Sequence, residues 1–113
     1  MNTIDKFYAL SAPIRREIIA LLSNGEQLTA TVIANRFQVS APAISQHLKV
    51  LLESNVLQMH KQAQQRIYRL NSDAIVELES WANEIKTQLN KAGLVGDNQP
   101  TNSNLAKESG EQC

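Results

Sequence analysis

Apolar residues recur at helical spacing in two segments of the first half of the chain. In residues 13–22 and again in residues 41–52 they stand at i, i+4, i+7 and i+8, the spacing that places side chains on one face of a helix. Each segment is therefore expected to form an amphipathic helix. The apolar positions are Ile14, Ile18, Leu21 and Leu22 in the first segment, and Ile44, Leu48, Leu51 and Leu52 in the second.

Residues that begin and end helices surround these two segments. Pro13 stands at the first expected helical position, and Gly25 follows the same segment as a left-handed cap. Thr29 is a good N-cap for a short third helix that ends near Phe37. Ser40 is a good N-cap for a helix that runs to about Leu52. Two helices joined by about three residues form the helix-turn-helix pattern.

The hydrophobic period changes from helical to alternating after this helix. Residues 56–60 and 66–70 read as two short strands, and the second alternates basic and apolar residues. The polar residues 61–65 between them form the tip of a predicted β-hairpin, which would be the wing of a winged helix. The tip contains no Gly or Asn, so its turn signal is weak.

The last apolar pattern predicts a long helix that pairs with a second copy of the chain. The helix begins after a cap at Asn71 or Ser72, and its apolar residues are spaced like a heptad repeat. A short helix at the start of the chain carries further apolar residues. We expect a homodimer through these two helices, with an interface of Ile4, Phe7, Tyr8, Ile75, Leu78, Trp81, Ala82, Ile85 and Leu89.

The length and composition suit one domain in a reducing compartment. With 113 residues, we expect a single domain over residues 1–92, followed by a disordered polar tail over residues 93–113. The lone cysteine, Cys113, cannot form an internal disulfide. No apolar run approaches the roughly 20 residues of a membrane span, and the N-terminus lacks signal-peptide features. These features predict a cytoplasmic protein with no membrane partner.

The charges sum to zero but are distributed unevenly. Residues 28–70 carry five Lys or Arg side chains against the single Glu53, a net charge of +4, while the rest of the chain after them is acidic. A basic segment that contains a helix-turn-helix indicates double-stranded DNA as the partner. With two His, one Cys and no Gly-rich phosphate loop, the chain has no catalytic constellation, and we do not expect an enzyme.

Three blocks of the chain together match one known pattern. Residues 10–19 (LSAPIRREII), 37–51 (FQVSAPAISQHLKVL) and 66–71 (RIYRLN) resemble the second helix, the recognition helix and the second wing strand of the ArsR/SmtB family of bacterial winged-helix repressors. The resemblance implies a mostly α fold with a small β-hairpin, the winged helix-turn-helix: four helices, two strands and a last helix. It also implies a bacterial repressor that is dimeric through its first and last helices and nucleoid-associated when bound.

The sequence departs from the family pattern where function is concerned. Ala12 stands in place of a capping Asp, so that cap is lost or moves to Ser11, and Gln38 replaces a usual Gly. The Cys and His ligands of metal-sensing members are missing. Asp73 and Glu77 alone would bind a transition metal poorly, and a solvated face near a helix N-terminus is the simpler interpretation. We expect no metal and no cofactor, as in the metal-free branch of SdpR-like autorepressors.

The helix that begins after Ser40 is predicted to read bases in the major groove. Gln46 is the best candidate for base recognition, because its amide donates and accepts together; alternatively, it is simply an exposed helix residue. His47 either contacts DNA or packs within the helix-turn-helix. The residues of this helix expected at the DNA are Ser40, Ala41, Ala43, Ser45, Gln46, His47 and Lys49.

Residues outside this helix are expected to contact the DNA backbone or, in the wing, the minor groove or the backbone, and the phosphate contacts set register and affinity. They are Gln64, Gln65 and Arg66 in the wing, and at least one of Arg15 and Arg16 at the start of the second helix. The alternative for each arginine is a surface salt bridge, for instance with Glu17 or Asp5.

These features predict a sequence-specific repressor that acts as a homodimer on a palindromic operator of its own or an adjacent operon. Two alternatives stay open. One is a repressor released by a small molecule or by protonation of His47 or His60, although the sequence identifies no effector. The other is a winged-helix module that binds protein.

Overall fold

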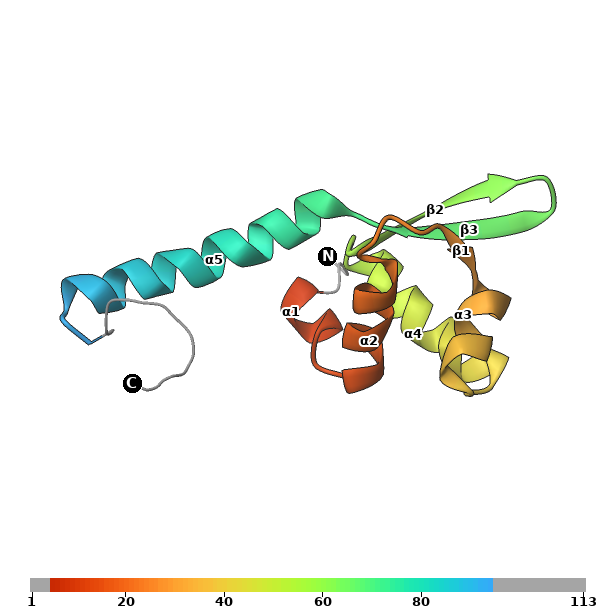
Figure 1. Ribbon diagram of the computed structural model, residues 1–113, viewed down its shortest axis with the longest axis horizontal. Coiled ribbons are helices and arrows are strands. Elements are labelled where there is room, and N and C mark those ends of the chain that lie inside the picture. The colour runs from red at the N-terminus through yellow and green to blue at the C-terminus, as the bar shows by residue number, and fades with distance from the viewer. Residues whose placement is uncertain (1–4, 95–113) are drawn as a thin grey trace. The chain divides into compact units, whose positions relative to one another are not determined.

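The computed structural model describes residues 5–94 of the chain. The helices are α1 (Lys6–Ala9), α2 (Pro13–Leu22), α3 (Ala30–Phe37), α4 (Ala41–Glu53) and α5 (Ser72–Lys91). The strands are β1 (Leu28–Thr29), β2 (Leu57–Gln62) and β3 (Gln65–Leu70). The chain divides into two compact units at the boundary between Leu78 and Glu79, which lies within α5. The predicted mostly helical fold with a β-hairpin is confirmed (Figure 1).

Side-chain caps begin the helices of the helix-turn-helix. Thr29 Oγ1 accepts a hydrogen bond from Val32 N at 3.2 Å, and Ser40 Oγ accepts one from Ala43 N at 3.3 Å. Both predicted N-caps are thus confirmed. Ala12 precedes α2 without a side-chain cap. Ser11 does not replace it, because its hydroxyl donates back to Tyr8 O at 2.6 Å.

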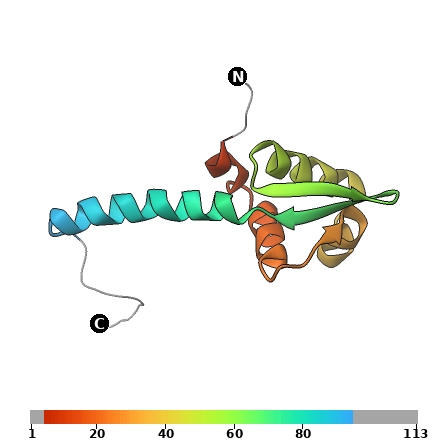
Figure 2. The ribbon, with the colours of Figure 1, turned by 90° about the horizontal axis from the view of Figure 1, so that it is seen from above.

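The sheet has three antiparallel strands in the order β1-β3-β2. The hairpin of β2 and β3 is the predicted wing, and its tip projects past the helices in both views (Figures 1 and 2). The strand β1 was not predicted from the sequence, since two residues are too few to show an alternating pattern. Leu28 pairs with Tyr68 and Thr29 pairs with Ile67, so β1 joins the start of α3 to the wing.

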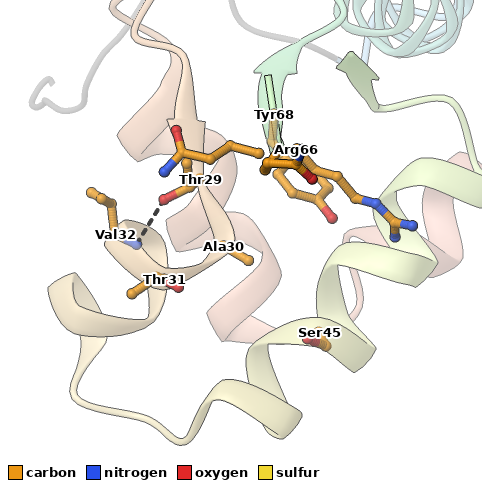
Figure 3. Close-up of a pocket in the computed structure, with 9 residues that line it drawn as sticks. Thr29, Ala30, Thr31, Val32, Ser45, Arg66 and Tyr68 are labelled. Atoms are coloured by element: carbon orange, nitrogen blue, oxygen red, sulfur yellow. Dashed lines mark hydrogen bonds between the residues drawn. The ribbon is translucent and has the colours of Figure 1, made fainter. Parts of the chain in front are cut away.

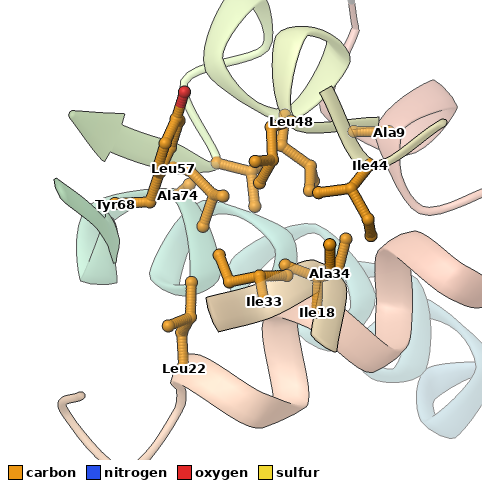
Figure 4. Packing of buried hydrophobic residues seen from close by; sticks show 12 residues of the cluster. Ala9, Ile18, Leu22, Ile33, Ala34, Ile44, Leu48, Leu57, Tyr68 and Ala74 are labelled. Atoms are coloured by element: carbon orange, nitrogen blue, oxygen red, sulfur yellow. The ribbon is translucent and has the colours of Figure 1, made fainter. Parts of the chain in front are cut away.

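The core lies between the sheet and helices α2, α3 and α4 (Figures 1 and 4). Its α4 face consists of the three predicted residues Ile44, Leu48 and Leu51, all buried. Burial of one such side chain contributes roughly 1.5–3 kcal/mol. The opposite face of α4 therefore remains at the surface. The largest fully buried side chains elsewhere in this core are Ile18, Leu22, Ile33, Val56 and Leu57.

The turn of the wing holds an L-residue in a strained backbone conformation. Gln62 pairs with Gln65, so Ala63 and Gln64 form a two-residue turn. Ala63 has a φ of +58°, in the region where glycine is favoured over residues with a Cβ. The chain closes this hairpin without the glycine whose absence weakened the turn signal.

Replacing Ala63 by glycine is expected to raise the free energy of unfolding by about 0.5–1 kcal/mol, because the steric cost of positive φ disappears. Gln64 is the matched control, since it has no positive φ. Gln64→Gly should lower stability, because it only adds freedom to the unfolded chain. Urea unfolding followed by circular dichroism measures both changes. Effects of the same sign at the two positions would contradict a strained turn.

Candidate nucleic-acid interface

The outer face of α4 presents small and polar side chains. Ala41, Ser45, Gln46 and Lys49 are exposed, whereas Ala43 is half-buried. Small residues at the start of the helix keep its surface low, while Gln46 and Lys49 extend beyond it. A helix of this shape fits the width of the DNA major groove, with amide and ammonium groups available for base edges and phosphates.

The connection between α3 and α4 depends on a residue in the left-handed conformation. Gln38 caps the end of α3 with φ 55° and ψ 39°. This conformation ends α3 and lets the chain turn within two residues toward Ser40. The sequence resemblance places glycine at this position, so Gln38 performs the same reversal at a steric cost.

Arg15 lies inside the protein and joins α1 to α4. Arg15 is 6% exposed. Its Nε donates to Ala9 O at 2.8 Å, one Nη donates to Tyr8 O at 3.2 Å, and the other Nη lies 3.1 Å from His47 Nδ1. It also stacks over the Tyr8 ring, with its Cζ 5.2 Å from the ring centroid. Arg15 Nη2 also donates to Ser11 Oγ at 3.3 Å.

This burial favours Arg16 over Arg15 for the predicted contact with the DNA backbone. The Arg15 guanidinium is occupied by main-chain carbonyls and by His47, so we assign it to the packing of α1 against α4. Arg16 is exposed and donates to Leu10 O. Within residues 5–94 neither arginine forms an ion pair with Asp5 or Glu17. A backbone contact by Arg16 stays a prediction.

The bond from Arg15 fixes the state of the half-buried His47 ring. A guanidinium only donates, so His47 Nδ1 must accept, and the single ring proton then sits on Nε2. Burial first, and the charge of Arg15 second, hold the pKa of His47 below its usual value. This contact supports the interpretation that His47 packs within the protein. Its hydrogen-bond partner is the Arg15 side chain and not the backbone. A DNA contact through Nε2 stays a prediction.

The protein is expected to lose stability in mild acid through His47. Its folded-state pKa lies below the unfolded value of 6.5, so its contribution is present above that value and is lost as the pH falls through the folded pKa. Protonation removes the acceptor at Nδ1 and sets two cations side by side. Urea unfolding at about pH 8 and about pH 5 measures the difference. His47→Gln keeps an acceptor that does not titrate, and an undiminished pH dependence in that variant would refute this assignment.

The wing places two cationic side chains together that were not predicted to be neighbours. Lys61 lies directly opposite Arg66 in the β2–β3 register, and both are exposed. Like charges at directly opposite positions destabilise a hairpin, whereas a polyanion bound to the wing would offset that repulsion. Lys61 was missed because a strand register, and not its place in the sequence, brings it to Arg66. The predicted contacts Gln64 and Gln65 are exposed as well.

A groove of about 600 Å³ lies between the start of α3, the middle of α4 and the wing (Figure 3). We call it the wing groove. It brings together the predicted contacts Ser45, Gln64, Gln65 and Arg66 with two side chains that the sequence analysis missed, Thr31 and Tyr68. The remaining lining residues are Thr29, Ala30 and Val32.

The predicted dimer residues fall into two groups. Ile75 and Leu78 are half-buried. Phe7, Tyr8, Trp81, Ile85 and Leu89 are large, apolar and exposed, with exposed fractions of 39–55%, and the small Ala82 is exposed too. Lys6 Nζ lies 3.1 Å from Glu77 Oε1 and so ties α1 to the first part of α5. Ile4 lies outside the described residues, as does nearly all of the predicted tail.

Residues 5–94 contain no group of three or more His, Cys, Asp or Glu side chains placed to hold a metal ion. No helix in that range has both the length and the apolar character of a membrane span.

The chain is similar in sequence to one bacterial regulator family and to known repressors. The profile described as "Bacterial regulatory protein, arsR family" matches residues 12–58. The transcriptional repressor SdpR of Bacillus subtilis (strain 168) is 38% identical over 81 residues, which are 72% of this chain and 87% of that protein. The arsenical resistance operon repressor of Staphylococcus xylosus is 39% identical over 73 residues, 65% of this chain and 67% of that protein.

A solved structure shows the same fold. The ArsR-like transcriptional regulator from Rhodococcus sp. RHA1 superimposes with a TM-score of 0.68 at 26% identity, covering 76% of this chain and 80% of that one.

Proposed function

The chain belongs to the ArsR family of bacterial DNA-binding transcription regulators, and from this premise we propose that it represses transcription as a homodimer on a palindromic operator. The observation that carries the proposal is the arrangement of α4. Ile44, Leu48 and Leu51 are buried on one face, so Ser45, Gln46 and Lys49 are exposed on the other. The wing, with Lys61 opposite Arg66, adds positive charge beside this face.

The exposed apolar residues of α5 support the homodimer. Ile85 and Leu89 are 46% and 39% exposed, and with Ala82 they continue the heptad-like spacing along one face of the helix. Burying such a face is favourable, and a second copy supplies the same face by symmetry. A two-fold dimer would place two α4 helices about 34 Å apart, one turn of DNA. The operator would then be an imperfect palindrome.

Gln46 and Arg66 are expected to differ in what they contribute to DNA binding. Gln46→Ala should reduce discrimination among single-base operator variants by about 1–3 kcal/mol, because it removes a base contact. Arg66→Ala should weaken binding to all sequences alike and flatten the salt dependence, because it removes a phosphate contact. Fluorescence anisotropy with wild-type and variant duplexes at several salt concentrations separates the two. Unchanged discrimination in Gln46→Ala would refute base reading by that residue.

A direct test uses the DNA upstream of the protein's own coding region. We expect the homodimer to shift a fragment of this region at moderate salt and to protect a palindromic site from nuclease. Protein that is folded and dimeric but binds this fragment no better than unrelated DNA would count against autoregulation. Such a regulator would act in the cytoplasm, where its DNA lies.

A further inference from the structure

The Tyr68 side chain is buried, and its hydroxyl has no hydrogen-bond partner within residues 5–94. Tyr68 is 8% exposed, and its ring belongs to the core cluster. Figure 4 shows the hydroxyl at the margin of that cluster, directed away from Leu57 and Ala74. No side chain or carbonyl within residues 5–94 accepts from it or donates to it. A phenol hydroxyl in this position can donate to a ligand or to water.

The unpartnered hydroxyl opens into the wing groove, which Tyr68 lines. Figure 3 shows it pointing away from the strand toward α4, where Ser45 lies. Arg66 and Tyr68 are two residues apart on β3, so their side chains stand on the same face of the sheet. The phenol is therefore held by core packing on one side and faces the wing groove, with Arg66 in its lining, on the other.

Three further polar side chains of the groove can donate hydrogen bonds. Thr31 and Ser45 have hydroxyls, and Arg66 has a guanidinium, and within residues 5–94 none of these three side chains forms a hydrogen bond or ion pair. The groove has no acidic side chain among its lining residues. Thr31 also lies in the first turn of α3, where backbone N–H groups lack helical acceptors. Hydroxyls, a guanidinium and a helix N-terminus are the groups that bind phosphate in protein–DNA complexes.

We propose that the wing groove binds a phosphate group of the DNA backbone, with Tyr68 Oη and Thr31 Oγ1 as donors beside Ser45 and Arg66. The inference rests on the proposed function, in which α4 enters the major groove and the wing lies beside it. A DNA strand that passes from one to the other crosses the groove between them. Tyr68 and Thr31 are then positioning residues that hold the strand without reading its sequence.

The test compares isosteric variants that each remove one hydroxyl. Tyr68→Phe and Thr31→Val are expected to weaken binding about fivefold each, and equally for the upstream fragment and for an unrelated duplex. Because both changes are uncharged, the slope of log Kd against log salt should stay as in the wild type, whereas Arg66→Ala lowers it. Thr87→Val is the matched control, an exposed threonine on α5 far along the chain from the groove, and should leave Kd unchanged.

A thermal melt separates a DNA contact from a structural role. Tyr68→Phe should keep or raise Tm, because the hydroxyl has no partner to lose. A fall in Tm well beyond that of Thr87→Val would show that the hydroxyl stabilises the fold and would overturn the proposal. The proposal would also be overturned if the double variant Tyr68→Phe, Thr31→Val bound DNA with a Kd within twofold of the wild type. That outcome would leave the proposed function intact.

The source of the phosphate is tested separately with inorganic phosphate. Amide chemical shifts of Thr31 and Arg66 are followed as phosphate is added at constant ionic strength. If the wild type binds neither duplex, the proposed function fails. Phosphate shifts that disappear in Tyr68→Phe would then show a site for a free anion and would overturn the proposal of a DNA phosphate. The absence of both DNA binding and phosphate shifts would overturn the groove as a phosphate site.

Discussion

Arg15→Ala is expected to lower the free energy of unfolding by about 3 kcal/mol, because it leaves one buried acceptor and two part-buried acceptors unpaired. Arg15 donates to the carbonyls of Tyr8 and Ala9 and lies against His47 Nδ1. Ala9 is fully buried, so water cannot easily replace the lost donor. Without Arg15, the short α1 also loses its tie to α4, and DNA affinity should fall with stability.

Arg16→Ala is the matched control for this prediction. Arg16 is the next residue of the same helix, but it is exposed and donates to one carbonyl, that of Leu10. Its replacement should cost less than about 1 kcal/mol. Urea unfolding at one protein concentration compares the two variants, since dimer stability depends on concentration. Losses of similar size would show that the buried network of Arg15 does not hold α1 in place.

Arg15→Lys gives a finer test of the same network. A lysine keeps the charge but presents one compact donor group in place of a planar fork. It cannot reach the α1 carbonyls and His47 together, so we expect most of the loss seen with alanine. Full stability in Arg15→Lys would mean that charge alone matters at this site.

Ile85→Glu is expected to convert the protein to a monomer and to weaken operator binding at least about hundredfold, because two linked half-sites bind far more tightly than one. Ile85 lies on the apolar face of α5 that we assign to the dimer. A carboxylate there would be buried without a partner in the paired state, which is costly. Analytical ultracentrifugation measures the oligomeric state, and fluorescence anisotropy measures the affinity.

Val76→Glu provides the control for that substitution. Val76 is also an exposed apolar residue of α5, 56% accessible, but it lies off the heptad-like spacing of Ile75 and Leu78. The variant should stay dimeric and bind DNA like the wild type, apart from the small effect of one added negative charge. Equal dissociation by the two variants would place the interface elsewhere on the helix.

Local sequence features predicted the helices and the position of the recognition helix. The spacing of Ile44, Leu48 and Leu51, with Ser40 as the cap, predicted which face of α4 is buried, because helical geometry acts over a few residues. The strands were placed to within two residues. The wing turn at Ala63 had no recognisable signal, because the chain accepts a strained residue where glycine is usual.

The contacts that depend on distant residues could not be predicted in this way. Arg15 and His47 are 32 positions apart. Nothing in the sequence around either residue indicates that the guanidinium of Arg15 would lie against the ring of His47. The strand β1 could not be predicted either, because its two residues form a strand only by pairing with the distant β3. Lys61 and Arg66 became a pair only through the hairpin register.

The sequence by itself determined that this chain has a recognition helix, Ser40 to about Leu52, with a basic segment around it, because periodicity, capping and charge are local properties. Only the tertiary structure decided which of its basic and polar side chains are buried and which line a groove. Packing buried Arg15 beside His47, lowered the pKa of His47 and left the hydroxyl of Tyr68 at the wing groove. The physical reason is that burial and hydrogen bonding depend on what the fold brings together, and those neighbours lie far apart in the chain.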